Sequence, residues 1–131
     1  MFHVLPDGGD VRGSSFSLPD TWLQAVAGFL DVHATTLVPG GVRGNHYHLS
    51  GRELLLVLHR ESWSAHWDTG EGTPVSSRTF PGPGAVLVEV ALGCSHAVRN
   101  DGSTDLQIIG FRDRPFDPAD PDAHPREVVP V

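Results

Sequence analysis

Apolar and polar residues alternate with a period of two over much of the chain, which predicts β-strands. The clearest case is ESWSAHWD at residues 61–68, where Trp63, Ala65 and Trp67 fall on one face and the polar residues between them on the other. Turns rich in glycine and proline separate about eight or nine such segments, at intervals of roughly ten residues. This spacing is typical of a β-sandwich or a β-barrel.

One early segment has helical spacing instead. Asp20 is a suitable N-cap, and the apolar residues that follow it recur every three or four positions: Trp22, Leu23, Val26, Phe29 and Leu30. We therefore expect one short N-terminal helix. A strand is expected before it, near residues 11–18, and a last short strand near residues 127–129.

The length of 131 residues predicts one domain over residues 1–131, with a core at about 31–112 and a proline-rich tail at 113–131. The segment ELLLVL at residues 53–58 is apolar on both faces, although a strand with one solvated face should alternate. We expect its outer face to be covered by the helix, by the tail or by another subunit.

Composition limits the partners of the protein. A net charge of −7 argues against a nucleic-acid surface, because such surfaces need clustered basic residues. No segment approaches the roughly 20 apolar residues of a membrane span, and no basic leader precedes an apolar run. The single cysteine, Cys94, excludes an internal disulfide. We therefore expect a cytoplasmic protein that binds a small molecule and neither nucleic acid nor membrane.

The stretch GGVRGNHYHLSGRE places two histidines two residues apart. His46 and His48 share one face of a strand, Glu53 follows after a tight turn, and His96 begins a later strand. If the four side chains meet, they form a site for one divalent ion, which could be Zn²⁺, Fe²⁺, Mn²⁺, Ni²⁺ or Co²⁺. The alternative is that an H-x-H pair merely lies on the surface.

The spacing H-x-H-x4-E at residues 46–53, followed by G-x2-H-x3-N at residues 93–100, resembles the two motifs of the cupin superfamily. The resemblance implies an all-β fold, a double-stranded β-helix or jelly-roll barrel. It also implies a metal held by His46, His48, Glu53 and His96. Small cupins often pair through their sheets, so the resemblance further implies a homodimer.

A narrower resemblance concerns function. RGNHYH at residues 43–48 and the tail FDPADPDAHPREVV are similar to the C-terminal cupin domain of capsular-polysaccharide sugar epimerase/reductases. The opening is similar, more weakly, to the motif of dTDP-4-dehydrorhamnose 3,5-epimerases. In that family the motif histidine removes a proton beside a ketone, which would make His46 a catalytic base. The resemblance implies an isomerase or epimerase of a nucleotide-linked keto sugar, in polysaccharide or glycosylated-metabolite synthesis.

Several further residues are candidates for this chemistry. Arg43, Arg52 and Arg99 lie near the expected ligands and would suit a diphosphate. His33 is a candidate second catalytic residue at the cavity mouth. The only tyrosine, Tyr47, should point away from His46, so the tyrosine acid of the metal-free epimerases has no counterpart here.

Two rival functions stay open at this stage. Three histidines and one glutamate suit an Fe²⁺-dependent oxygenase equally well, and a cupin can also be a non-catalytic ligand-binding module. A further alternative concerns His46 itself, because one imidazole cannot easily be both a metal ligand and a free base.

Overall fold

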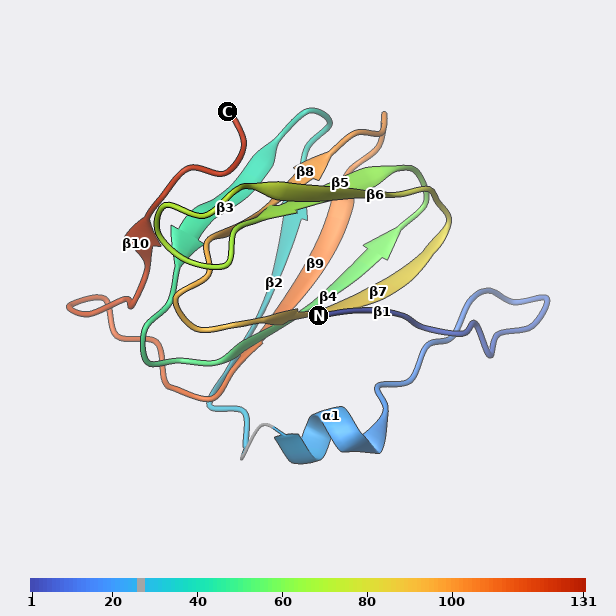
Figure 1. Ribbon diagram of the computed structural model, residues 1–131. Helices are drawn as coiled ribbons and strands as arrows, with labels where there is room; N and C mark the ends of the chain where they lie inside the picture. The colour runs from blue at the N-terminus through green and yellow to red at the C-terminus, as the bar shows by residue number, and fades with distance from the viewer. Residues whose placement is uncertain (26–27) are drawn as a thin grey trace.

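Two antiparallel sheets face each other and enclose the core (Figure 1). The structure, a computed structural model, describes residues 1–25 and 28–131. The first sheet has the order β1-β7-β4-β9-β2, with β1 (Phe2–Val4), β2 (Asp31–Leu37), β4 (Glu53–His59), β7 (Gly84–Val90) and β9 (Leu106–Arg112). The second has the order β10-β3-β8-β5-β6, with β3 (Val42–Tyr47), β5 (Trp63–Trp67), β6 (Ser76–Phe80), β8 (His96–Asn100) and β10 (His124–Pro125). The predicted all-β class is confirmed.

The core lies between the sheets and follows the predicted alternation. Trp63 and Ala65 of β5 are buried in it, and Trp67 packs against it. The Trp63 ring is fully buried and stacks on Phe80 with 4.5 Å between ring centroids. Val57 of β4 is fully buried from the opposite sheet. The period-two pattern therefore identified the inward face correctly.

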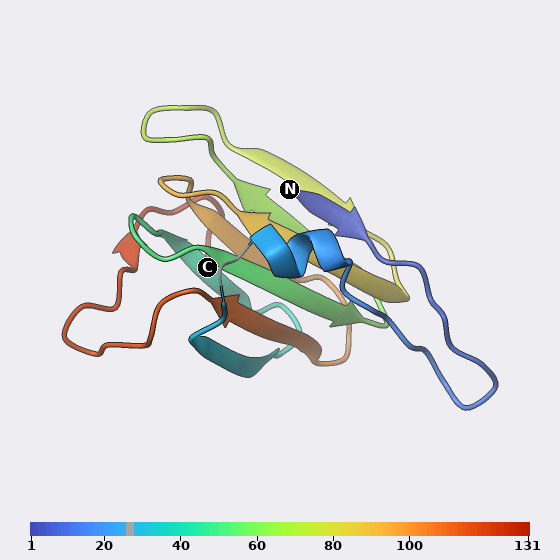
Figure 2. The same cartoon turned by 90° about the horizontal axis from the view of Figure 1, so that it is seen from below.

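The outer face of the first sheet is covered by the N-terminal part of the chain. Leu54, buried to 2% exposure, belongs to a second apolar cluster with partly buried residues that precede β2: Phe16, Leu18, Trp22 and Phe29. Helix α1 (Asp20–Ala25) lies across this sheet in the view from below (Figure 2). This covering explains why β4 is apolar on both of its faces.

Three sequence expectations need correction or restriction. Phe29 and Leu30 lie beyond the helix, and Val26 lies outside the described residues. Residues 11–18 form no strand, because the Asp7 carboxylate accepts the amides of Gly9 and Ser15 and closes a loop there.

The last strand is β10, several residues before the expected position. Val128 and Val129 instead pack in a small apolar cluster with Val42 and Ala97 on the outer side of the second sheet. Because a buried pair of valines need not pair as a strand, the pattern alone did not distinguish the two cases. No helix among the described residues has the length and apolar character needed to cross a membrane.

Candidate metal centre

A β-bulge in β3 sets the direction of the residues in the RGNHYH motif. Arg43 pairs with Val98 of β8, and His46 pairs with His96, so an extra residue stands between them on β3. Gly44 has φ 110° and Asn45 has φ 57°, values that favour glycine and asparagine. Because of the bulge, Arg43 and His46 both lie opposite inward-facing residues although they are three positions apart.

The other two motif residues hold the tail against the second sheet. The Asn45 side chain accepts the amides of Val128 and Val129 at 2.9 and 3.1 Å and donates to the Val129 carbonyl. The Tyr47 ring stacks on His124 and lies under the Arg126 guanidinium, 4.3 Å from its centroid. As expected, Tyr47 therefore faces away from His46.

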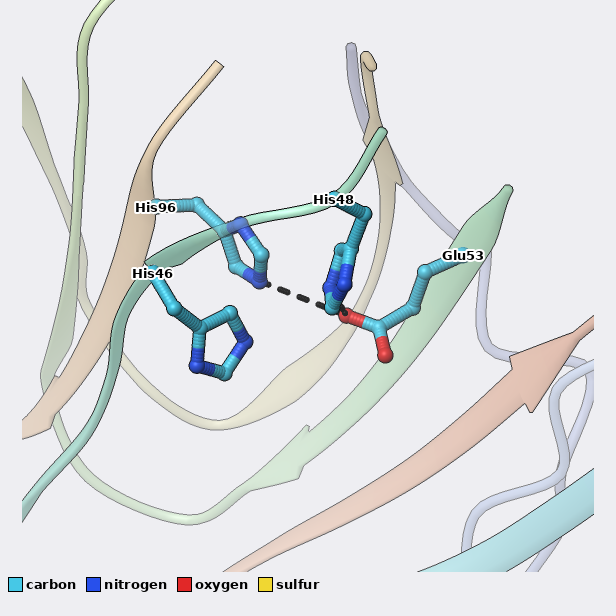
Figure 3. Close-up of side chains that lie close together, drawn as sticks. All are labelled: His46, His48, Glu53 and His96. Carbon is cyan, nitrogen blue, oxygen red and sulfur yellow. Dashed lines mark ion pairs between the residues drawn. The ribbon is translucent and has the colours of Figure 1, made fainter. Parts of the chain in front are cut away.

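The four predicted metal ligands come together at one end of the barrel. The nearest donor atoms of His46, His48, Glu53 and His96 all lie within 4.8 Å of one another. Nε2 of His48 and Nε2 of His96 lie 3.4 and 3.3 Å from Oε1 of Glu53. Figure 3 shows both rings directed at this carboxylate, with the His46 ring beside them. The strands β3, β4 and β8 supply three of the four residues, and His48 follows β3 directly.

The hydrogen bonding of His48 fits a metal ligand. Its Nδ1 donates to the carbonyl oxygen of Asp122 at 2.6 Å, because a carbonyl can only accept. In the neutral ring, the lone pair then lies on Nε2, which faces the other three residues. This atom is buried and lies 3.4 Å from Oε1 of Glu53, but it makes no hydrogen bond of acceptable geometry with any residue that the structure describes. A buried nitrogen without a hydrogen bond is costly, and a bound cation would satisfy it.

Electrostatics inside the cluster support the same conclusion. Burial lowers the pKa of His46 to about 4, assisted by the neighbouring His96 and His48, so this ring is neutral near pH 7. Burial opposes ionisation of Glu53, but the adjacent His48 and His96 rings, 3.4 and 3.3 Å from its Oε1, outweigh it and hold its pKa well below the usual range. Burial also lowers the pKa of His48, but Glu53 and the Asp122 carbonyl raise it more, so the net shift is upward. His46 and Glu53 therefore already have the protonation states that metal binding requires, whereas His48 must lose a proton below its raised pKa.

Asp122 organises the loop between His48 and Glu53, and sequence reasoning did not single it out. Its buried carboxylate accepts the amides of Leu49, Ser50 and Gly51 at 2.9, 3.1 and 2.8 Å, and Arg112 lies 3.2 Å away. These bonds hold the pKa of Asp122 far below its usual range against the effect of its burial. The signal in the sequence was only an aspartate in a proline-rich tail.

A second buried ion pair supports the start of β8. Arg126 contacts Asp68 through two bonds of 2.7 and 2.8 Å, and Asp68 accepts the Ser95 amide at 2.8 Å. Ser95 precedes His96 of the cluster and donates from Oγ to the Arg126 carbonyl. Asp68 follows the alternating segment of β5 and carries a charge, yet it is only 4% exposed.

A cavity of about 380 Å³ opens beside the cluster. Its wall includes three of the clustered residues, His46, Glu53 and His96, together with His33 and Arg43. Nε of Arg43 donates to the Thr36 carbonyl at 3.3 Å. The bulge thus places Arg43 at the cavity wall, whereas a regular strand would turn it to the same face as Tyr47.

The other two candidate arginines lie elsewhere. Arg52 lines a separate cavity of about 180 Å³ with Trp22 and Leu54. Arg99 pairs with Val42 and Ser64 in the second sheet and contacts Asp101 at 2.6 Å. Neither lines the cavity beside the cluster.

Comparison with known proteins identifies the family and the fold of the chain. A family model described as the polysaccharide biosynthesis C-terminal domain matches residues 10–124. The capsular polysaccharide assembling protein CapF from Staphylococcus aureus is 25% identical, with a TM-score of 0.69 over 96% of this chain and 33% of CapF. The chain thus spans about a third of CapF. No match is found among the curated proteins.

Two more distant structures share the fold. The sugar epimerase NovW from Streptomyces spheroides is 18% identical, with a TM-score of 0.69 over 90% of this chain and 65% of NovW. A dTDP sugar isomerase from Desulfovibrio desulfuricans G20 is 13% identical, with a TM-score of 0.74 over 98% of this chain and 83% of the isomerase. The fold is therefore that of the RmlC-like cupins, and the chain belongs to the polysaccharide biosynthesis C-terminal domain family.

Proposed function

We propose that the chain binds one divalent metal ion through His46, His48, Glu53 and His96, and that the loaded site isomerises or epimerises a nucleotide-linked keto sugar. The observation that carries the metal proposal is the buried Nε2 of His48, which lacks a hydrogen bond within the described chain while Asp122 fixes the other ring nitrogen. Three imidazoles and one carboxylate suit Zn²⁺, Fe²⁺, Mn²⁺, Ni²⁺ and Co²⁺.

The proposed reaction removes a proton from a carbon beside a ketone. A divalent ion in this site supplies Lewis-acid polarisation of the ketone oxygen. The chain's own residues bind and orient the sugar: the cavity beside the cluster admits it, and the Arg43 guanidinium at the wall suits an anionic diphosphate. Epimerisation and ketoisomerisation both begin with this proton abstraction.

The related structures support the substrate class. CapF assembles capsular polysaccharide, NovW is a 4-keto-6-deoxy sugar epimerase, and ChmJ, a 3′-monoepimerase, has been crystallised with dTDP-quinovose. CapF has also been crystallised with the inhibitor 3-isopropenyl-tropolone, whose two adjacent oxygens form a chelating group. By analogy we propose a nucleotide-linked keto sugar as substrate for this chain. The predicted homodimer stays a prediction, which sedimentation velocity would test.

Elemental analysis tests the metal proposal directly. The protein is purified without a histidine tag, beside the variants His48→Ala and His96→Ala. His66→Ala is the matched control, because His66 lies on β5 and its Nε2 bonds to Ser64 rather than to the cluster. We expect about one ion per chain in the wild type and the control, and loss of the ion in both cluster variants. Equal metal content in all four proteins would contradict the ligand assignment.

Solvent exchange tests the reaction. The metal-loaded protein is incubated with dTDP-4-keto-6-deoxyglucose in D₂O, and deuterium incorporation beside the ketone is followed by NMR. We expect incorporation that depends on the metal. Oxygen consumption with the sugar would indicate an oxygenase instead, and saturable binding of the sugar without exchange would indicate a binding module.

A further inference from the structure

The proposed ligand set leaves the cavity in need of a separate proton-transferring group. A histidine whose lone pair binds a metal cannot also accept a proton from the substrate, which removes His46 from this role. Among the described residues that line the cavity, His33 is the only imidazole outside the ligand set, and imidazole is the most common general base in enzymes. The Arg43 guanidinium has no lone pair that accepts a proton, and the Thr35 hydroxyl is a weak base.

The position of His33 suits proton transfer. It lies on β2, on the wall of the cavity that the first sheet provides, whereas His46 and His96 come from the second sheet. Its Nδ1 lies 3.2 Å from Oδ2 of Asp31. In the neutral ring this contact favours the proton on Nδ1 and leaves the lone pair on Nε2.

Gly110 of β9 makes room for the His33 ring. Gly110 pairs with His33 on one side and with the core residue Leu55 of β4 on the other. A Cβ atom at Gly110 would lie 2.7 Å from Cε1 and 2.8 Å from Nε2 of His33. The ring therefore lies over the glycine, on the inward face of the sheet and toward the strand that begins at Glu53.

We infer that His33 transfers the proton in the reaction proposed above, on which this inference rests, and that Asp31 and Gly110 position it. Nε2 of His33 takes a proton from the carbon beside the ketone. The C–H electron pair becomes the C=C bond of an enolate, while the C=O π pair moves to the oxygen. Return of a proton to carbon restores the ketone, so no oxidant or reductant is consumed.

Deuterium exchange into the keto sugar is the first test, with metal content measured on every protein. We expect His33→Gln to lower the exchange rate at least about 100-fold and Gly110→Ala at least about tenfold, with metal content unchanged. His66→Gln, outside the cavity wall, is the control and should exchange at the wild-type rate. A deuterium exchange rate of His33→Gln within twofold of the wild-type rate would overturn the inference.

A binding experiment without turnover gives an independent answer. The zinc-loaded, ¹⁵N-histidine-labelled protein is titrated with tropolone, a planar chelating mimic of an enolate, and the His33 ring signal is followed by NMR. We expect this signal to shift with saturation in the wild type and to lose that shift in Gly110→Ala. A His33 signal that stays unchanged while tropolone saturates the metal would overturn the inference.

The two experiments separate the failure of this inference from the failure of the proposed function. If the wild-type protein incorporates no deuterium into the keto sugar, the proposed reaction is contradicted. The tropolone titration still shows whether His33 faces a ligand bound at the metal site. A protein that binds no metal overturns both proposals.

Discussion

Nδ1 of His48 lies 2.6 Å from the carbonyl oxygen of Asp122, a residue 74 positions later in the chain. This contact fixes which nitrogen of His48 is free to bind a metal. The Asp122 carboxylate at the same time holds the three amides that follow His48. Asp122, in the C-terminal tail, therefore fixes both the His48 ring and the loop that leads from His48 to Glu53.

Substitution of Asp122 should weaken metal binding without removing a ligand. Asp122→Ala keeps the carbonyl but leaves the amides of residues 49–51 without their acceptor, so the loop that joins His48 and Glu53 loosens. We expect zinc affinity to fall about 10- to 100-fold and the free energy of unfolding to fall by about 2–4 kcal/mol. Zinc titration and urea unfolding would measure these effects.

Asp120→Ala is the matched control for this change, because the Asp120 side chain is 70% exposed in the same tail. It should leave zinc affinity within about twofold and the free energy of unfolding within about 0.5 kcal/mol of the wild type. A zinc affinity that is equal in the two variants would contradict the role given to Asp122.

Metal affinity should fall with decreasing pH, because protons compete with the metal for its histidine ligands. The pKa of His48 is raised above 6.5 in the metal-free protein, so below that raised pKa a proton must leave before the metal binds. His46, with a pKa of about 4, is already neutral and adds no competition near neutral pH. We expect the zinc dissociation constant to rise at least about tenfold per pH unit on the acid side of the His48 pKa.

Competition with a chromophoric zinc indicator, measured over about pH 5 to 8, would give this slope. A dissociation constant independent of pH would contradict the raised pKa of His48. A rise steeper than about tenfold per pH unit would show that more than one histidine ligand loses a proton on metal binding.

The bulge at Gly44 should tolerate no side chain. A Cβ atom there would lie 2.8 Å from Cα of Ala97 on the neighbouring strand, and the residue has φ 110°. We expect Gly44→Ala to lower the free energy of unfolding by about 2 kcal/mol or more and to reduce zinc binding, because both His46 and His96 adjoin this contact. Thermal unfolding and elemental analysis would measure the two effects.

The Gly70→Ala variant is the control, because it introduces backbone strain without the steric clash expected at Gly44. Gly70 also has a positive φ, 139°, but a Cβ atom there meets nothing within 4 Å. Its loss of stability should be smaller, with zinc content unchanged. If Gly70→Ala reduced zinc content as much as Gly44→Ala, the assignment to the bulge would be wrong.

The outer apolar cluster should support stability but not the metal. Leu54 is 2% exposed and packs under the N-terminal segment, while its neighbour Glu53 points to the opposite face. Leu54→Ala should lower the free energy of unfolding by about 2–4 kcal/mol, through lost burial and a residual cavity. Denaturant unfolding and zinc content on the same sample would check this, and loss of the metal would contradict the separation of the two faces.

The period-two pattern predicted an all-β fold, and the resemblance to the cupin motifs predicted the set of clustered residues. Alternation on β5 marked the core, and the motif spacing brought together His46, His48, Glu53 and His96. The alternation is a local feature of one strand. The cluster depends on strands that pair as they do in the cupins that the motifs resemble.

The rest could not be predicted because it depends on long-range contacts. The direction of Arg43 depends on a bulge whose register against β8 has no signature beyond Gly44. The burial of Asp68 depends on Arg126, 58 residues later, and the role of Asp122 on a loop 71 to 73 residues earlier. A charged residue in a turn is the same sequence signal whether it is solvated or is the partner of a distant ion pair.

The tail contacts also constrain when the site can form. All four clustered residues lie at or before position 96, but Asp122, Arg126 and the two valines that Asn45 holds come later in the chain. During vectorial synthesis, the emerging polypeptide therefore contains every donor atom well before the segment that orders them. The metal uptake proposed above would then follow the docking of residues 122–129.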